Sequence, residues 1–167
     1  MEIWDGYYKD GTPANIDLIR GGSIPKGLFH IVCEVLVRHV DGDYLLMQRD
    51  FAKPHYAGRF EATAGGSALK GEDGLTCAKR ELLEETGICS DSFTPIGKTI
   101  TNDTIYLGYL CVTDCEKTSV TLQEGETVAY RWVSETEFIA FVNSGEIIEG
   151  QKQRYLQYFE EKGYLAG

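Results

Sequence analysis

Apolar residues occur in short runs separated by turn-forming residues, a pattern typical of β-strands. Residues 29–37 are largely apolar and rich in β-branched side chains, which predicts a buried strand. A second apolar run at 44–47 follows the turn signal Asp41-Gly42, so the two runs are predicted to form a hairpin. Further strands are expected at 59–64, 96–101, 104–112 and 128–133.

Helical spacing takes over after the first group of strands. Leu75, Ala78 and Leu82 recur at intervals of three and four residues, so they are predicted to face the core from one helix. Gly87 follows this segment and is a suitable C-terminal cap.

The C-terminal region, residues 135–163, is also predicted to be helical. One helix is expected to begin near Ser134, where Ser-Glu-Thr-Glu resembles a capping box, and another to cover 146–162. The order of strands, helix, strands and helices favours an α+β fold, built as an α/β/α sandwich with a mixed sheet. No repeat or linker divides the chain, so one domain is expected over 1–167. Residues 1–28 are broken by glycines and form an N-terminal extension, either an added strand or a dimer arm.

Composition then limits the classes of function. The chain has 167 residues and a net charge of −10, so nucleic acid is not an expected partner. A small anionic substrate requires a cation to mediate the contact. There is no apolar run of about 18 residues, so no membrane span is expected. The five cysteines include no Cys-x-x-Cys pair, and no secretory signal is recognisable, which favours a cytoplasmic protein with reduced thiols.

One helix carries an arrangement of acids that local stability does not explain. Glu81, Glu84 and Glu85 fall within an arc of roughly 100° on the predicted helix. Like charges at this spacing cost about 0.2–0.5 kcal/mol per pair, and near the C-terminal end they also oppose the helix dipole. A hard divalent cation such as Mg²⁺ would account for them, because it prefers carboxylate oxygens as ligands.

The segment 66–88, which contains this helix, resembles the signature of the Nudix hydrolases at every specified position. The matching residues are Gly66, Glu72, Arg80, Glu81, Leu82, Glu84, Glu85, Gly87 and Ile88. The resemblance continues before the signature at 58–66 and after it at 132–134, and it covers about 29–140. It implies the Nudix fold, an α/β/α sandwich with a mixed sheet, in which 66–88 forms a loop, a helix and a loop.

The resemblance also implies a metal site. Glu84 and Glu85 would be the main ligands of Mg²⁺, for which Mn²⁺ can substitute. Glu81 would be a further ligand, or the base that deprotonates water. Gly66 would let its backbone approach the metal closely, and Gly87 would end the helix in the left-handed region.

Other residues receive supporting roles from the same resemblance. Glu72 would act through water or by holding Arg80, and Arg80 would orient the carboxylates rather than touch substrate. The general base stays open, because some family members use the helix glutamate and others a glutamate on a later loop. Glu126 is the best candidate on that loop, and Glu124 is the reserve.

The implied reaction is metal-dependent hydrolysis of a pyrophosphate linkage by attack of water at phosphorus. The expected partner is a small nucleotide-like molecule of the nucleoside diphosphate-X type, with X unspecified. Arg49, Lys53 and Arg59 lie beside the expected cleft and are candidates for phosphate contacts. Many relatives are dimers, so homodimerisation is a further expectation.

Two rival functions remain. Ile3-Trp4-Asp5 and residues 24–30 look similar to the Nudix proteins related to isopentenyl-diphosphate isomerase, which makes isomerisation the first rival. Those isomerases resemble one another in a catalytic cysteine just before the helix, and 59–68 contains no cysteine. The second rival is a non-catalytic nucleotide-binding Nudix module. Such modules often lose acids of the signature, whereas this chain has all of them.

Overall fold

The computed structural model describes all of residues 1–167. Its strands are β1 (Ile3–Tyr7), β2 (Pro13–Ile19), β3 (His30–His39), β4 (Tyr44–Arg49), β5 (Phe60–Ala62), β6 (Ala64–Ser67), β7 (Phe93–Ile100), β8 (Thr104–Thr113) and β9 (Thr127–Val133). Its helices are α1 (Gly74–Thr86), α2 (Glu135–Val142), α3 (Glu149–Arg154) and α4 (Leu156–Lys162), with a short 3₁₀ turn at Lys117–Ser119.

Seven strands form one mixed sheet, ordered β5-β4-β3-β8-β7 along its main path. Strands β3 and β8 run parallel over their full length, and the other pairs are antiparallel. Strand β6 pairs with β3, and β9 pairs with β4. The predicted hairpin between β3 and β4 forms, although these two strands pair only at Arg38 and Tyr44 before they diverge.

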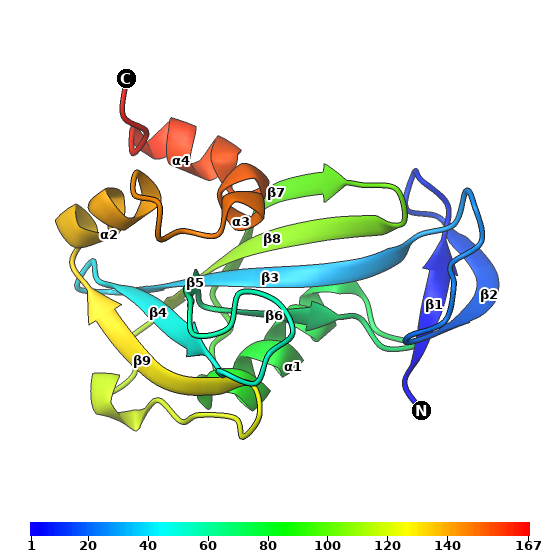
Figure 1. Cartoon of the computed structure of the whole chain (residues 1–167), viewed down its shortest axis with the longest axis horizontal. Coiled ribbons are helices and arrows are strands. Elements are labelled where there is room, and N and C mark those ends of the chain that lie inside the picture. The colour runs from blue at the N-terminus through cyan, green and yellow to red at the C-terminus, as the bar shows by residue number, and fades with distance from the viewer.

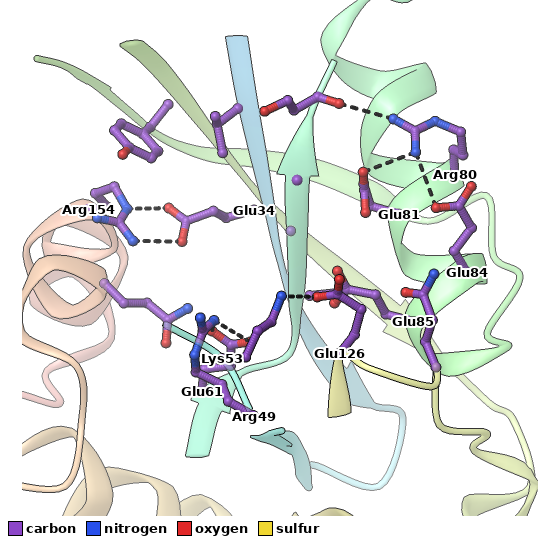
Figure 2. Close-up of a pocket in the computed structure, with 18 of the residues that line it drawn as sticks. Glu34, Arg49, Lys53, Glu61, Arg80, Glu81, Glu84, Glu85, Glu126 and Arg154 are labelled. Carbon is purple, nitrogen blue, oxygen red and sulfur yellow. Dashed lines mark hydrogen bonds and ion pairs between the residues drawn. The ribbon is translucent and has the colours of Figure 1, made fainter. Parts of the chain in front are cut away.

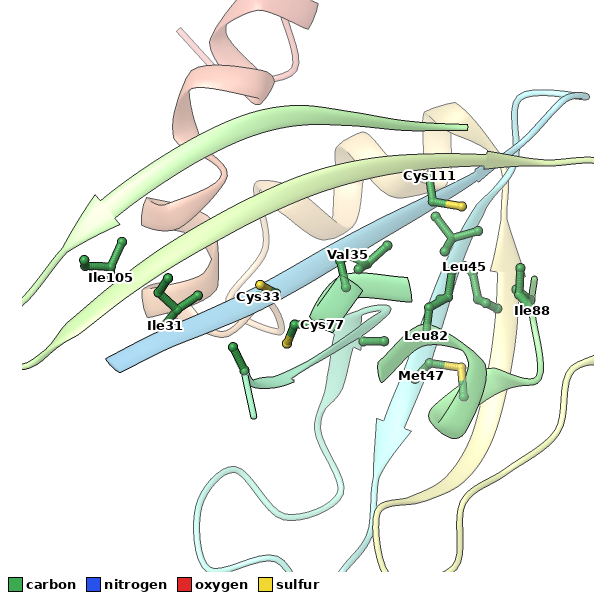
Figure 3. Close-up of a cluster of buried hydrophobic side chains, with 14 of the residues drawn as sticks. Ile31, Cys33, Val35, Leu45, Met47, Cys77, Leu82, Ile88, Ile105 and Cys111 are labelled. Carbon is green, nitrogen blue, oxygen red and sulfur yellow. The ribbon is translucent and has the colours of Figure 1, made fainter. Parts of the chain in front are cut away.

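Helices cover both faces of this sheet (Figure 1). On one face α1 packs its buried residues Cys77, Ala78 and Leu82 against β3, β4 and β8 (Figure 3). On the other face α2 and α4 bury an aromatic cluster that includes Phe138, Tyr158 and Phe159. The predicted α/β/α sandwich with a mixed sheet is therefore confirmed. No helix is long and apolar enough to cross a membrane.

The predicted strand at 59–64 is divided into β5 and β6 by a bend at Thr63, whose φ is 60°. β-Branched residues rarely adopt this left-handed conformation, so the contacts around Thr63 must hold it there. Its side chain is fully buried, accepts a 3.0 Å hydrogen bond from the Val37 backbone N–H and donates one of 2.8 Å to the Leu45 carbonyl. Thr63 thus joins β3 to β4 where they separate, and the bend transfers the chain from one partner to the other.

Two details of the helices differ from the prediction. Leu75 is 40% exposed, and the inner face of α1 is instead completed by Cys77 and by Thr86. The single helix expected at 146–162 is divided into α3 and α4 at Tyr155. The Tyr155 ring, where the two helices meet, is fully buried and packs close to Gly108 of β8.

The N-terminal extension forms a two-stranded antiparallel sheet, β1 and β2, separate from the main sheet. Backbone hydrogen bonds join Tyr7 to Phe29, and Trp4 stacks on His30 with ring centroids 4.2 Å apart. Asp5 accepts a 2.7 Å hydrogen bond from the Gly71 backbone N–H. These contacts fix the hairpin against the loop that leads into α1 (Figure 1).

Replacing Thr63 with valine is expected to destabilise the protein by about 2 kcal/mol or more, since two buried backbone groups lose their only side-chain partner. Thr63→Ser keeps the hydroxyl and should cost about 1 kcal/mol, mainly from the lost methyl group. Urea denaturation, with unchanged m-values, measures both. Equal losses for the two variants would show that the hydroxyl does not hold the bend.

Candidate active site

A cavity of about 420 Å³ opens on the sheet beside α1 (Figure 2). Of the 20 residues that line it, only three are hydrophobic. Its acidic residues are Glu2, Glu34, Glu61, Glu81, Glu84, Glu85 and Glu126, and its basic residues are Arg20, Arg49, Lys53, Arg80 and Arg154. The cavity is therefore almost entirely polar, and carboxylates outnumber the cations.

Helix α1 places its acids in the cavity because its other face is fixed to the core. Asp73 caps the N-terminus by accepting a 2.8 Å hydrogen bond from the Thr76 backbone N–H. At the other end Gly87 adopts a φ of 75°, and its N–H donates to the Leu83 carbonyl, as predicted for a left-handed cap.

Arg80 gathers the carboxylates of this helix (Figure 2). Its guanidinium donates to Glu72 at 2.7 Å and 2.9 Å, to Glu81 at 3.0 Å and to Glu84 at 3.2 Å. A further hydrogen bond reaches the Ser67 carbonyl. The hydrogen bonds from Arg80 hold the pKa of the Glu72 carboxyl below its usual range. The structure thus brings together four residues that the signature proposed for the site.

Gly66 lies directly beneath the carboxylate of Glu81. A Cβ atom at position 66 would come within 2.2 Å of Oε1 of Glu81, so any side chain would displace this acid. Cys77 lies below the same loop, with its Sγ 3.5 Å from the Gly66 carbonyl oxygen. Glu81 is half-buried as a result, and burial raises the pKa of its carboxyl.

Glu85 is the only acidic residue of the cavity that has no basic partner. The other six form ion pairs with the five basic residues, whereas Glu85 is 7% exposed and takes part in none. Burial, reinforced by the nearby charges of Glu61, Glu81 and Glu126, raises the pKa of Glu85 to about 9. Its site therefore favours either a proton or an added cation.

The predicted loop residues Lys53 and Glu126 also line the cavity. Glu126 forms an ion pair with Lys53, and Arg49 contacts Glu61 at 3.2 Å (Figure 2). Burial raises the pKa of Glu61. Glu124, the reserve candidate for the base, is exposed and does not line the cavity.

Arg59 does not line the cavity either. Its guanidinium donates to the backbone carbonyls of Gly145, Glu146 and Ile147, at distances from 2.7 to 3.2 Å. These bonds fix the loop between α2 and α3 and use the donors that a phosphate contact would need. The structure places Arg59 in a connecting role, and only Arg49 and Lys53 of the three predicted basic residues reach the site.

The available ligands suit a hard cation, since they are carboxylate and carbonyl oxygens without an exposed thiol or imidazole. No three acidic, histidine or cysteine side chains already converge on one point. Arg80 explains this, because it holds Glu81 and Glu84 on its own nitrogens.

Several residues of the cavity were not predicted from the sequence. Glu34 of β3 and Arg154 of α3 face each other there (Figure 2). The ring of Tyr106 of β8 lies beneath the Arg154 guanidinium. Glu34 carried a usable signal, since a carboxylate inside an apolar strand needs a partner. Nothing in the sequence around Arg154 indicated that it would reach the cavity. Glu2 and Arg20 come from the N-terminal hairpin, and nothing in their local sequence placed them at the cavity.

Comparison with known proteins agrees with this architecture. The family model of the NUDIX domain matches residues 29–154. An uncharacterized Nudix hydrolase of Listeria monocytogenes is 32% identical over 150 residues, which is 89% of each chain. The structure of DR0079 from Deinococcus radiodurans has a TM-score of 0.71 at 17% identity, covering 92% of this chain and 99% of that one. The MutT protein from Methanosarcina mazei Go1 has a TM-score of 0.63 at 21% identity, covering 84% and 99%.

The two structural likenesses show the fold, and the sequence matches show the family. The matched region includes β3 to α3 and with them the acidic helix, Arg80 and the loop of Glu126. This chain belongs to the Nudix hydrolase family, whose enzymes act on phosphoric anhydrides.

Proposed function

We propose that this protein is a Mg²⁺-dependent pyrophosphohydrolase that cleaves a nucleoside diphosphate-X substrate by attack of water at phosphorus. The observation that carries the proposal is Glu85, a buried carboxylate without a basic partner in a cavity where every other acid has one. An unpaired buried charge is costly, and a divalent cation removes that cost while attracting the phosphates of a substrate.

Glu81, Glu84 and Glu85, with the Gly66 carbonyl, would hold the metal. When bound, Mg²⁺ lowers the pKa of water and neutralises charge on the phosphates. Arg80 keeps the carboxylates of Glu81 and Glu84 near the cavity when no metal is present. Glu72 orients Arg80 in turn through two hydrogen bonds.

Two glutamates are suited to accept the proton of the attacking water. Glu81 is half-buried, and burial raises the pKa of its carboxyl, which makes it a better proton acceptor. Glu126 approaches from the opposite loop, where Lys53 orients it. Lys53 and Arg49 lie on the same side of the cavity and would contact the phosphates once released from their glutamates.

The lining of the cavity supports hydrolysis over isomerisation of an isoprenoid diphosphate. Its three hydrophobic residues provide no apolar wall for a hydrocarbon chain. No cysteine lines it, because Cys33 and Cys77 are fully buried beneath the sheet and the loop at Gly66. A purely nucleotide-binding module would not need the complete set of acids. All five cysteines are unpaired, which suits a reducing cytoplasm.

The direct test is a Mg²⁺-dependent screen of nucleoside diphosphate-X compounds in ¹⁸O-labelled water, with products identified by mass. Cleavage of the anhydride and one labelled phosphate product are expected. Isopentenyl diphosphate is included in the panel. A shift of its double bond, without release of phosphate from any compound, would sink the hydrolase proposal.

Glu85→Gln is expected to lower turnover by orders of magnitude and leave the fold intact, because the amide is neutral and a poor ligand for Mg²⁺. Steady-state kinetics and circular dichroism check the two parts. Glu161→Gln on the exposed side of α4 serves as the control and should retain full activity. Near-normal turnover in a folded Glu85→Gln protein would remove Glu85 from the metal site.

The same substitution should stabilise the protein when metal is absent. The pKa of Glu85 rises from 4.5 to about 9 on folding, so between these values the unfolded chain releases a proton that the folded chain retains. Stability is therefore lost as pH rises through this range, and glutamine removes the loss. In EDTA the melting temperature of Glu85→Gln should exceed that of the wild type by an amount that grows from pH 5 to pH 8.5.

In excess Mg²⁺ the wild type should instead have the higher melting temperature, since the cation binds the folded wild type and not Glu85→Gln. Melting curves with and without metal measure both effects. A variant less stable than the wild type at every pH in EDTA would contradict the assigned charge state of Glu85.

A further inference from the structure

One wall of the cavity lies opposite α1 and has no role in the proposed chemistry (Figure 2). It consists of Glu34 on β3, Tyr106 on β8, and Gln151 and Arg154 on α3. These four residues come from three separate elements, and all four carry hydrogen-bonding side-chain groups.

Glu34 and Arg154 form a bidentate ion pair through Nε and Nη2 of the arginine, with 3.0 Å between Nη2 and Oε2. Their side chains are 10% and 23% exposed. The guanidinium also lies over the Tyr106 ring, 4.4 Å from its centroid. A buried ion pair is weak evidence for stability, because desolvation offsets most of the attraction. It does fix both side chains in one orientation, as a preorganised binding site requires.

Two polar groups at this wall have no partner within the protein. Nη1 of Arg154 makes no hydrogen bond, and neither does the side-chain amide nitrogen of Gln151, whose oxygen accepts from the Ala62 backbone N–H at 2.8 Å. Both residues line the cavity, so a ligand bound there, or water, can complete these groups.

The chemistry of the wall restricts that ligand. Glu34 repels a phosphate, and the charge of Arg154 is already balanced, so the phosphates are directed to the opposite side of the cavity. An apolar group would leave the free donors unpaired. A planar polar group with a donor beside an acceptor fits, because it can donate to Glu34, accept from Arg154 or Gln151, and stack on the guanidinium.

We infer that Glu34 and Arg154 determine substrate specificity by binding a nucleobase, a planar group whose edge presents a donor beside an acceptor. The inference rests on the proposed function, because it assigns the organic part of the same substrate. It orients the molecule with its phosphates at Glu81 and Glu85 and its base at α3.

The test compares binding of the four common nucleoside monophosphates with that of ribose 5-phosphate, which lacks only the base. Isothermal titration calorimetry is performed in excess Mg²⁺. The wild type should bind at least one nucleotide more tightly than ribose 5-phosphate by about tenfold or more, the contribution of one good polar contact to a base. The double variant E34Q/R154Q removes both charges together and should bring this ratio near unity, with the affinity for ribose 5-phosphate unchanged.

The matched control is R38Q/E135Q. Arg38 and Glu135 also join β3 to a C-terminal helix, at 2.9 Å, but do not line the cavity. This variant should keep the preference for the base. Arg154→Lys provides a second measurement should E34Q/R154Q not fold, since lysine keeps the ion pair but lacks Nη1 and the planar group. It should also lose most of the preference.

Three results would overturn the inference: a wild type that binds no nucleotide better than ribose 5-phosphate, a preference that survives in E34Q/R154Q or in Arg154→Lys, or an equal loss in the control. Hydrolysis by the wild type is measured in parallel. Cleavage of an anhydride without any preference for a base removes the inference and leaves the proposed function standing. Binding of a base through Glu34 and Arg154 without cleavage of any anhydride contradicts the proposed function and leaves the role of these two residues standing.

Discussion

The arrangement of the site depends on the interaction between Arg80 and three carboxylates. Glu81 and Glu84 on α1 would repel each other and Glu72 in the loop before it, and the guanidinium of Arg80 holds all three within hydrogen-bonding distance. One arginine cannot serve a fourth acid, and Glu85 is left without a cation. Glu85 is thereby the one buried acid of the site that needs a proton or, as we propose, a divalent ion in place of a basic partner.

Sequence reasoning was most successful where the function depends on spacing along one helix. The positions of Glu81, Glu84 and Glu85, the cap at Gly87 and the capping box at Ser134 follow from local periodicity, and the structure contains them all. Arg80 was expected to pair with acids, and it does. These features need no knowledge of how distant segments meet.

The remaining features depend on contacts between segments far apart in the sequence. Glu34 and Arg154 are 120 positions apart, and only the docking of α3 on the sheet brings them together. Arg59 looked like a phosphate ligand because of its neighbours, yet the carbonyls at 145–147 claim its donors. The bend at Thr63 divides a strand that its composition predicts to be continuous. In each case tertiary partners decided the outcome, and local sequence does not encode them.

The complete pairing of the five basic residues in the cavity has a consequence for how a substrate enters. A phosphate chain that arrives alone must separate an arginine or lysine from its glutamate before it gains a contact, so it exchanges one ion pair for another. A chain that arrives with its own cation meets Glu85, which has no ion pair to break, and only the pairs of Glu81 and Glu84 with Arg80 must then open. The form recognised on entry would then be the metal complex of the nucleotide, and flux through the enzyme would follow the free magnesium concentration of its surroundings as well as the supply of nucleotide.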